Sequence, residues 1–408
     1  MNKQVSHIPS GYKPSPLGII PEDWEVKRLG EVGEVFSGGT PNTEIQEYWN
    51  GNIDWCTPTD ITLLNGAVYI ERTALKITDL GLKSSSAVLL PPNSIIVCTR
   101  ATIGNAAISL HQIATNQGFK NIVPNENIDT LFLYYTIVNN KIRLIRLGNG
   151  STFLEVSKSD FENLTIPVPP LPEQHRIVSV LSLWDTAIAK QTALIEKLTL
   201  RKRGLMQQLL TGKKRLKGFS GEWKEVRLGK LFDERNETNC DNLPLLSITG
   251  DKGVIYQSES DKRDISNEDK SKYKHICPND IGYNTMRMWQ GRSALSELEG
   301  IVSPAYTIVI PKDNIDVRFM AMLIQQPRIV YSFWTHSQGL VSDTLNCKYP
   351  DFCQVKVVIP SKEEQTAVAD FFVEIDKEIE TQKQKLVAMQ EQKRGLMQVL
   401  LTGKRRIL

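Results

Sequence analysis

A fifteen-residue segment occurs twice in this chain, and this repeat limits the possible folds more than any other feature of the sequence. Residues 202–216 read KRGLMQQLLTGKKRL and residues 393–407 read KRGLMQVLLTGKRRI, so twelve of fifteen positions are identical at a spacing of 191 residues. The same spacing pairs Glu173 with Glu364. Because self-similarity at a fixed spacing marks a repeated structural unit, we expect the two halves to share one architecture.

The beginning of each half also repeats, at slightly different spacings. Arg28-Leu29-Gly30 matches Arg227-Leu228-Gly229 at a spacing of 199, and residues 127–129 match residues 314–316 at a spacing of 187. The change in spacing confines insertions and deletions to the segments between the matched blocks. Each half should therefore combine a fixed frame with a variable middle.

The repeated block carries apolar residues in steps of four and three, which is typical of a coiled-coil seam. Proline-rich segments followed by an acidic residue precede each stripe, and Gly212 and Gly403 follow it as helix C-terminal signals. The pattern predicts two helices of about 38 residues, each roughly 55 Å long. The two stripes consist of Ile177, Leu181, Trp184, Ile188, Gln191, Ile195, Leu198, Lys202, Leu205 and Leu209, and of Val368, Phe372, Ile375, Ile379, Gln382, Leu386, Met389, Lys393, Leu396 and Leu400.

The equal register of the two stripes, each with a Gln and a Lys at matching places, favours pairing of the two helices. The alternative is that each stripe is the buried face of a long helix within its own domain. Paired helices would run antiparallel, because the first leads into the second half and the second returns along it. Gln191 and Gln382 would then either fix the register or face a solvated part of the seam.

Short β-rich runs separated by turn residues fill the rest of each half. Residues 94–99 and 164–168 of the first half predict strands, as do residues 305–310 and 355–359 of the second. One helix is expected in each of these regions. Asp129 and Asp316 are the expected N-caps of these helices.

The predicted fold class is therefore α/β. It consists of two mixed α/β domains joined by two long antiparallel coiled-coil helices in a pseudo-two-fold arrangement. The predicted globular domains are residues 1–168 and 218–359, and the predicted helical spacers are residues 169–217 and 360–408.

The composition excludes several classes of protein. The 408 residues carry 49 Lys and Arg against 46 Asp and Glu, so any nucleic-acid contact must come from local patches. The six cysteines form no C-x-x-C pair, which argues against a disulfide framework or a zinc knuckle and fits a reducing cytoplasm. The five histidines show no metal-ligand spacing, and no P-loop or other catalytic motif is present. We expect a chain without catalytic or metal-binding residues, which binds and positions other molecules.

Several motifs together resemble the specificity subunits of type I restriction-modification systems, and the resemblance covers essentially the whole chain. It implies two target recognition domains and two helical regions that bind two methyltransferase subunits and, in the nuclease form, two restriction subunits. The motifs are the W-x-x-x-R-L-G openings, Gly38-Gly39-Thr40-Pro41 with Tyr48-Trp49-Asn50-Gly51, the segment Ser157-Lys158-Ser159-Asp160-Phe161, and the duplicated KRGLMQxLLTGK.

The resemblance also implies a function on double-stranded DNA. The family's complexes read a bipartite target, one part per domain, across a nonspecific spacer, and methylate adenine at N6. S-adenosylmethionine is held by the methyltransferase partner, and ATP with Mg by the restriction partner, so this chain would need no cofactor. Since the second half lacks a counterpart of Gly38-Gly39-Thr40-Pro41, we expect an asymmetric target. A scaffold whose globular heads bind proteins and a self-sufficient enzyme are the alternative hypotheses.

Candidate DNA-binding residues lie in polar loops, where recognition is usually built. Arg reads guanine, and Asn or Gln reads adenine, in the major groove; the alternatives are phosphate contacts and arginines bonded to loop carbonyls. The candidates are Gly38, Gly39 and Thr40; Thr99, Arg100, Thr102 and Asn105; the polar loop 149–152; and Arg287, Trp289, Gln290 and Arg292. The charge-rich stretch with Lys262, Arg263, Lys270, Lys272 and Lys274 predicts either phosphate contacts or a solvated surface.

Overall fold

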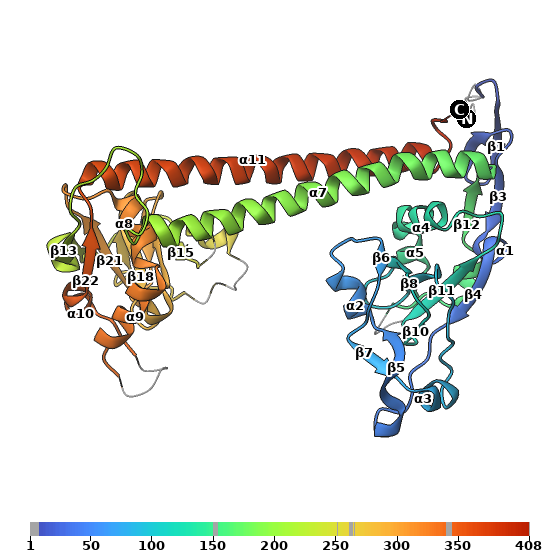
Figure 1. Ribbon diagram of the computed structural model, residues 1–408, viewed down its shortest axis with the longest axis horizontal. Coiled ribbons are helices and arrows are strands. Elements are labelled where there is room, and N and C mark those ends of the chain that lie inside the picture. Colours follow the sequence, from blue (N-terminus) through green and yellow to red (C-terminus); the bar gives the residue numbers. More distant parts are fainter. Residues whose placement is uncertain are drawn as a thin grey trace. The chain divides into compact units, whose positions relative to one another are not determined.

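The computed structural model describes residues 8–149, 154–250, 252–260, 264, 266–339 and 345–407. The chain folds into two units, the first formed by Met1–Gln191 with Lys385–Leu408 and the second by Thr192–Gln384. Two long helices, α7 (Leu171–Leu209) and α11 (Lys362–Leu400), each contribute one end to each unit (Figure 1). The C-terminal end of α11 belongs to the first unit, as the antiparallel arrangement predicts.

Both long helices have 39 residues, close to the predicted length. Each ends in the same way, because Gly212 and Gly403 adopt left-handed backbone with φ of 70° and 72°. The amide of Lys214 then donates to the carbonyl of Gln208. This six-to-one hydrogen bond is typical of a glycine C-cap. The equivalent bond, 191 residues later, runs from Arg405 to Val399.

The main sheet of unit 1 has the strand order β4-β11-β8-β9-β6. β8 reads Ile95-Ile96-Val97-Cys98, and all four side chains are buried, as a central strand covered on both faces requires. Its antiparallel neighbour β11 places Phe119 opposite Cys98. The strands of unit 1 are β1 (Tyr12–Ser15), β2 (Gly18–Pro21), β3 (Glu25–Arg28), β4 (Gly33–Ser37), β5 (Trp49–Cys56), β6 (Tyr69–Ile70), β7 (Leu75–Ile77), β8 (Ile95–Cys98), β9 (Ala106–Ser109), β10 (Ile113–Thr115), β11 (Phe119–Pro124) and β12 (Thr165–Val168).

The main sheet of unit 2 has the order β14-β21-β18-β19, which repeats the frame of the first. β18 lies between β21 and β19, just as β8 lies between β11 and β9, and all these pairs are antiparallel. The strands of unit 2 are β13 (Lys224–Arg227), β14 (Phe232–Arg235), β15 (Leu246–Ile248), β16 (Val254–Tyr256), β17 (Lys274–Ile276), β18 (Ile281–Asn284), β19 (Ser293–Leu295), β20 (Gly300–Val302), β21 (Tyr306–Pro311) and β22 (Lys356–Ile359).

The predicted N-caps are present in both units. The Asp129 carboxylate accepts a hydrogen bond from the Phe132 amide at 2.9 Å, and the Asp316 carboxylate accepts one from Phe319 at 3.2 Å. The prediction of one helix per half is wrong, because each half contains further helices besides the capped one. The helices before α7 are α1 (Leu29–Val32), α2 (Pro58–Leu63), α3 (Asp79–Lys83), α4 (Thr130–Asn139), α5 (Lys141–Leu147) and α6 (Lys158–Glu162), and those before α11 are α8 (Val317–Ile324), α9 (Pro327–His336) and α10 (Tyr349–Gln354).

The units differ in the segments between the shared elements. In unit 1 a sheet of order β10-β5-β7 is inserted, whereas unit 2 carries the pairs β15-β16 and β17-β20. These are the variable middles that the changing repeat spacing predicts.

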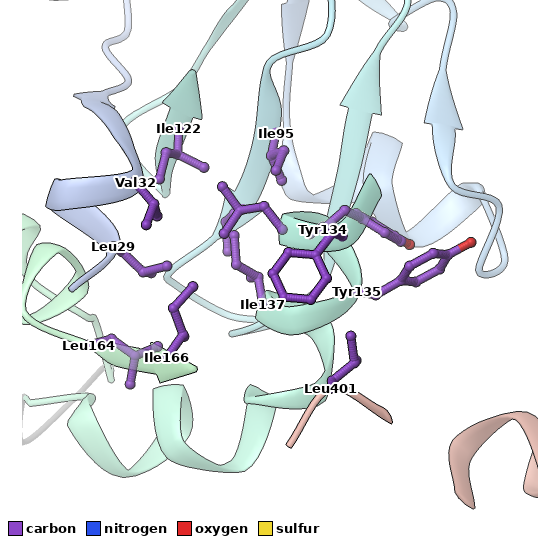
Figure 2. Close-up of a cluster of buried hydrophobic side chains, with 14 of the residues drawn as sticks. Leu29, Val32, Ile95, Ile122, Tyr134, Tyr135, Ile137, Leu164, Ile166 and Leu401 are labelled. Carbon is purple, nitrogen blue, oxygen red and sulfur yellow. The ribbon is translucent and has the colours of Figure 1, made fainter. Parts of the chain in front are cut away.

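The core of unit 1 joins its globular part to the returning end of α11. Leu29, Tyr135 and Ile166 belong to one buried cluster with Leu401, which follows α11. Figure 2 shows Leu401 beside Tyr135 on α4. In unit 2, Leu209 at the end of α7 belongs to the equivalent cluster with Phe319.

Candidate functional site

The predicted recognition residues around Arg100 and Arg287 lie in equivalent loops of the two sheets. Arg100 lies between β8 and β9, and Arg287 lies between β18 and β19. Both pairs are antiparallel neighbours at the same place in the strand order. The shared frame therefore presents two different sets of polar side chains from corresponding positions.

Arg100 of the first loop pairs with Glu155, which lies far from this loop in sequence. Its Nε donates to Oε2 of Glu155 at 3.1 Å, and a second guanidinium nitrogen contacts the same oxygen. Lys120 also approaches Glu155, with its ammonium 3.4 Å from Oε1. Partial burial raises the pKa of Glu155, but the hydrogen bond and charge of Arg100, together with Lys120, outweigh this effect and hold that pKa below its usual value. The side chain of Arg100 remains 42% exposed, so it can reach a ligand if it exchanges partners.

The other residues of the first loop differ in exposure. Thr99 is fully buried, and its amide donates to the carbonyl of Gly118 at 2.8 Å, so it supports the loop. Asn105 accepts a hydrogen bond from Lys141 at 2.7 Å. Thr102, Asn105 and Lys141 line a pocket of about 520 Å³ together with apolar side chains.

The second loop contains a 3-10 turn, Met288–Gln290, that anchors it to the core. Met288 is fully buried, and Gly291 follows it with a φ of 75°. Trp289 donates from its indole nitrogen to the carbonyl of Met286 at 3.0 Å. These contacts leave Arg287, Gln290 and Arg292 exposed, side chains with the hydrogen-bonding groups that major-groove recognition uses.

The predicted charge-rich stretch is only partly described. Lys262 and Arg263 lie outside the described residues, as do residues 150–152 of the other polar loop. Lys272 is exposed, whereas Lys274 lies on β17 with its ammonium 3.9 Å from Glu234. Lys272 is thus more accessible than Lys274 as a phosphate contact.

Gly38 and Gly39 form part of a tightly packed backbone crossing. A Cβ atom on Gly38 would lie 1.8 Å from the carbonyl oxygen of Asn116, and one on Gly39 would lie 2.3 Å from the amide of Ala87. The Gly39 carbonyl also accepts from the indole of Trp55 at 2.9 Å. Thr40 is exposed and hydrogen-bonds Gln117. The two glycines therefore have a direct structural role, while Thr40 stays accessible.

The helix ends carry matching ion pairs in the two units. In unit 1, Arg406 bonds Glu173, and in unit 2, Arg215 bonds Glu364, with Nε to Oε1 distances of 3.1 Å and 2.5 Å. Arg406 donates hydrogen bonds to Glu173 and to Asp23, and these bonds, that to Glu173 first, raise the pKa of Arg406. Each of these arginines follows one long helix, and each glutamate begins the other.

A second matched pair lies along the helices. Lys393 of α11 contacts Asp185 of α7 in unit 1, and Lys202 of α7 contacts Asp376 of α11 in unit 2. In unit 1, Tyr135 also donates to Asp185, and the Lys393 ammonium lies 4.9 Å from the centre of the Tyr135 ring. The two predicted seam lysines are thus the residues that bind these aspartates.

Every member of the two apolar stripes is buried or half-buried. Ile177 and Leu181 share a cluster with Leu400 and Met397 in unit 1. Leu209 shares one with Val368 and Phe372 in unit 2. The N-terminal part of each long helix therefore packs against the C-terminal part of the other.

Sequence reasoning missed Glu155, Lys120 and Lys141, which hold the first loop. No local pattern identifies them, because tertiary structure alone brings them to residues 99–105. The duplicated basic clusters that include Arg215 and Arg406 predict a role at the helix ends or in partner docking, but the glutamates that these two arginines bind could not be named from the sequence.

In the part of the chain that the structure describes, no helix combines the length and apolar character needed to cross a membrane.

Comparison with known proteins links residues 21–200 to a family model described as type I restriction modification DNA specificity domain. The specificity subunit of the type I restriction enzyme MjaIX from Methanocaldococcus jannaschii is 38% identical over 194 residues, which are 46% of this chain and 45% of that protein. The EcoR124I/EcoR124II specificity subunit from Escherichia coli is 31% identical over 182 residues, 43% of this chain and 44% of that protein. The matches thus span less than half the length of these two relatives.

Other similarities extend over nearly the whole chain. The MjaVIII specificity subunit from M. jannaschii is 25% identical over 417 residues, 95% of this chain and 94% of that protein. A chain from a structural study of complex assembly and conformational transition of the type I R-M system has 18% identity and a TM-score of 0.59, with 95% and 99% of the two chains covered. The S subunit from M. genitalium has 16% identity and a TM-score of 0.50, with 93% and 96% covered. These structural likenesses establish the fold.

Proposed function

We propose that this chain belongs to the family of type I restriction-modification specificity subunits, to which it is similar over nearly its whole length, and that it selects the DNA sequence on which a methyltransferase complex acts. The observation that carries the proposal is the pair of equivalent loops around Arg100 and Arg287. The two loops occupy equivalent places in similar sheets but carry different polar side chains. They are therefore suited to recognise two different short DNA sequences.

The target is accordingly bipartite and asymmetric. Residues 1–168 form the first recognition domain and residues 218–359 the second, with helical spacers at 169–217 and 360–408. Thr102, Asn105 and Arg100 serve the first half of the target, and Arg287, Gln290 and Arg292 serve the second. Lys272 contributes a phosphate contact, which strengthens binding without reading sequence.

The paired helices set the distance between the two halves of the target and bind the partners. The matched ion pairs of Arg406 with Glu173 and of Arg215 with Glu364 support this role, because they give the two helix ends the same local structure. Equivalent ends suit two copies of one methyltransferase subunit. In the nuclease form, two restriction subunits join the complex.

The chain contributes recognition and no chemistry of its own. Adenine-N6 methylation uses S-adenosylmethionine bound by the methyltransferase subunits, and ATP with Mg serves the restriction subunits. The six cysteines are free thiols, which supports action in the reducing cytoplasm.

Selection of DNA from a random-sequence pool by the assembled chain and methyltransferase tests this function. We expect enrichment of a split sequence whose two parts differ. A complex that assembles fully but enriches no sequence would contradict it and favour the scaffold hypothesis. Methyl transfer by the isolated chain would contradict the non-catalytic role.

A further inference from the structure

His275, Cys277 and Glu299 bring a nitrogen, a sulfur and an oxygen together in the variable middle of unit 2. The three donor atoms all lie within 4.8 Å of one another. The imidazole Nε2 is 3.4 Å from the Cys277 sulfur and 3.1 Å from Oε1 of Glu299. None of these residues belongs to the recognition loops or to the paired helix ends described above.

The strand register explains why the three side chains meet. β17 and β20 pair antiparallel, with Ile276 opposite Gly300. Continuing that register places Cys277, just after β17, opposite Glu299, just before β20. Residues two apart on a strand point to the same face, so His275 shares that face with Cys277.

A second carboxylate orients the imidazole from the other side. Nδ1 of His275 lies 2.7 Å from Oε2 of Glu237, and Arg235 in turn lies 2.9 Å from Oε1 of Glu237. Such a carboxylate behind a histidine fixes its tautomer and directs the remaining nitrogen toward a metal. With Nδ1 donating to Glu237, the lone pair of Nε2 can bind a metal ion. The Cys277 sulfur lies beside the ring, 3.4 Å from Nε2 and 4.0 Å from Nδ1, so its side chain must turn toward the Nε2 axis to share that ion.

We propose that His275, Cys277 and Glu299 bind a Zn²⁺ ion, with water as the fourth ligand. In a tetrahedral zinc site, with bonds of about 2.0 Å to nitrogen and 2.3 Å to sulfur, these two ligand atoms lie roughly 3.5 Å apart. The observed 3.4 Å between Nε2 and Sγ matches this separation. The ion would fasten the end of β17 to the segment that precedes β20.

The accessibility and the charge of the site suit ion entry. The Glu299 side chain is 57% exposed, whereas that of His275 is only 13% exposed. The carboxylates of Glu237 and Glu299 flank the His275 imidazole, and their negative charge favours a cation at this place.

Titration of the full-length chain with Co²⁺, followed by displacement with Zn²⁺, tests the site. We expect one equivalent of Co²⁺ to produce a thiolate-to-cobalt charge-transfer band that Zn²⁺ abolishes. Cys277→Ser should remove the band, and Glu299→Gln should weaken binding. Glu237→Gln should also weaken binding, by about tenfold, through the orientation of His275.

Matched controls come from the same unit. Cys240→Ser changes another partly exposed cysteine, and His336→Gln changes an exposed histidine; both should leave the band and the affinity unchanged. Absence of the band in the wild-type chain would overturn the proposal, as would a band that survives Cys277→Ser. If Cys277→Ser fails to fold, unchanged cobalt affinity in the folded Glu299→Gln variant would also overturn it.

Discussion

Arg406 and Glu173 form a two-bonded ion pair that ties the segment after α11 to the first turn of α7, with distances of 3.1 Å and 2.6 Å. Glu173 is buried and also accepts from the indole of Trp24 at 3.0 Å. The residues at the equivalent repeat positions, Arg215 and Glu364, form the same pair in unit 2. The sequence repeat is thus also a repeat of contacts.

Arg406→Met should destabilise unit 1, because it leaves the buried Glu173 carboxylate without its cationic partner. We expect the free energy of unfolding to fall by about 2 kcal/mol, measured by urea denaturation. Arg405→Met, at the exposed neighbouring position, is the control and should change it by less than about 0.5 kcal/mol. Equal effects of the two substitutions would show that the Glu173 contact does not stabilise the unit.

Exchanging the charges of Asp185 and Lys393 tests the antiparallel helix pairing. Lys393→Asp alone places two carboxylates together and should destabilise the chain, whereas the double variant with Asp185→Lys should recover part of the loss. A coupling of about 1 kcal/mol is expected from a double-mutant cycle. Additive effects would contradict the contact. Lys202 and Asp376 offer the same cycle in unit 2, with a smaller coupling because Asp376 is 55% exposed.

Gly38→Ala should destabilise unit 1 by about 3 kcal/mol, because the added methyl group meets the Asn116 carbonyl. Gly204→Ala is the matched control. Nothing lies within 4 Å of a Cβ atom at Gly204, and this residue is inside α7. Gly204→Ala should therefore raise the free energy of unfolding by about 0.5–1 kcal/mol. The midpoint temperature of thermal unfolding should therefore fall for Gly38→Ala and rise for Gly204→Ala. An unchanged midpoint for Gly38→Ala would contradict the close approach of the two backbone segments.

The lowered pKa of Glu155 predicts a pH dependence. A carboxyl group whose pKa is lower in the folded state stabilises the fold above its unfolded pKa of about 4.3, and this contribution is lost as the pH falls through the folded value. Glu155→Gln should therefore lower the free energy of unfolding at pH 7. It should also reduce the further loss of this free energy as the pH falls below the unfolded pKa of the carboxyl group. An unchanged acid-side slope would contradict the pairing with Arg100.

The sequence predicts the shared frame because strong local signals encode it. The heptad stripes, the aspartate caps and the glycines after the long helices each act through neighbouring residues, and the repeat doubles each signal. The helix α9 escaped prediction. In that helix, Ile329 and Phe333 are the buried residues, and tertiary packing rather than a long apolar stripe stabilises it.

The candidate DNA-binding loops could be predicted from the sequence only in part. Loop positions follow from the strands, so Arg100 and Arg287 could be placed in comparable stretches. Their partners could not be predicted, because Glu155 is 55 residues from Arg100 in sequence. The same holds for the His275 cluster, where the pairing of β17 with β20 brings Glu299 to a histidine 24 residues away.

Single-molecule mapping of N6-methyladenine would show whether this chain selects the DNA sequence that is methylated. DNA would come from cells that express the methyltransferase partner with the wild-type chain, with Arg100→Ala or with Arg287→Ala. We predict a split, asymmetric motif that requires the wild-type chain, with Arg100→Ala relaxing only one half and Arg287→Ala only the other. Methylation that does not depend on this chain, or an Arg287→Ala variant that alters both halves alike, would contradict the account.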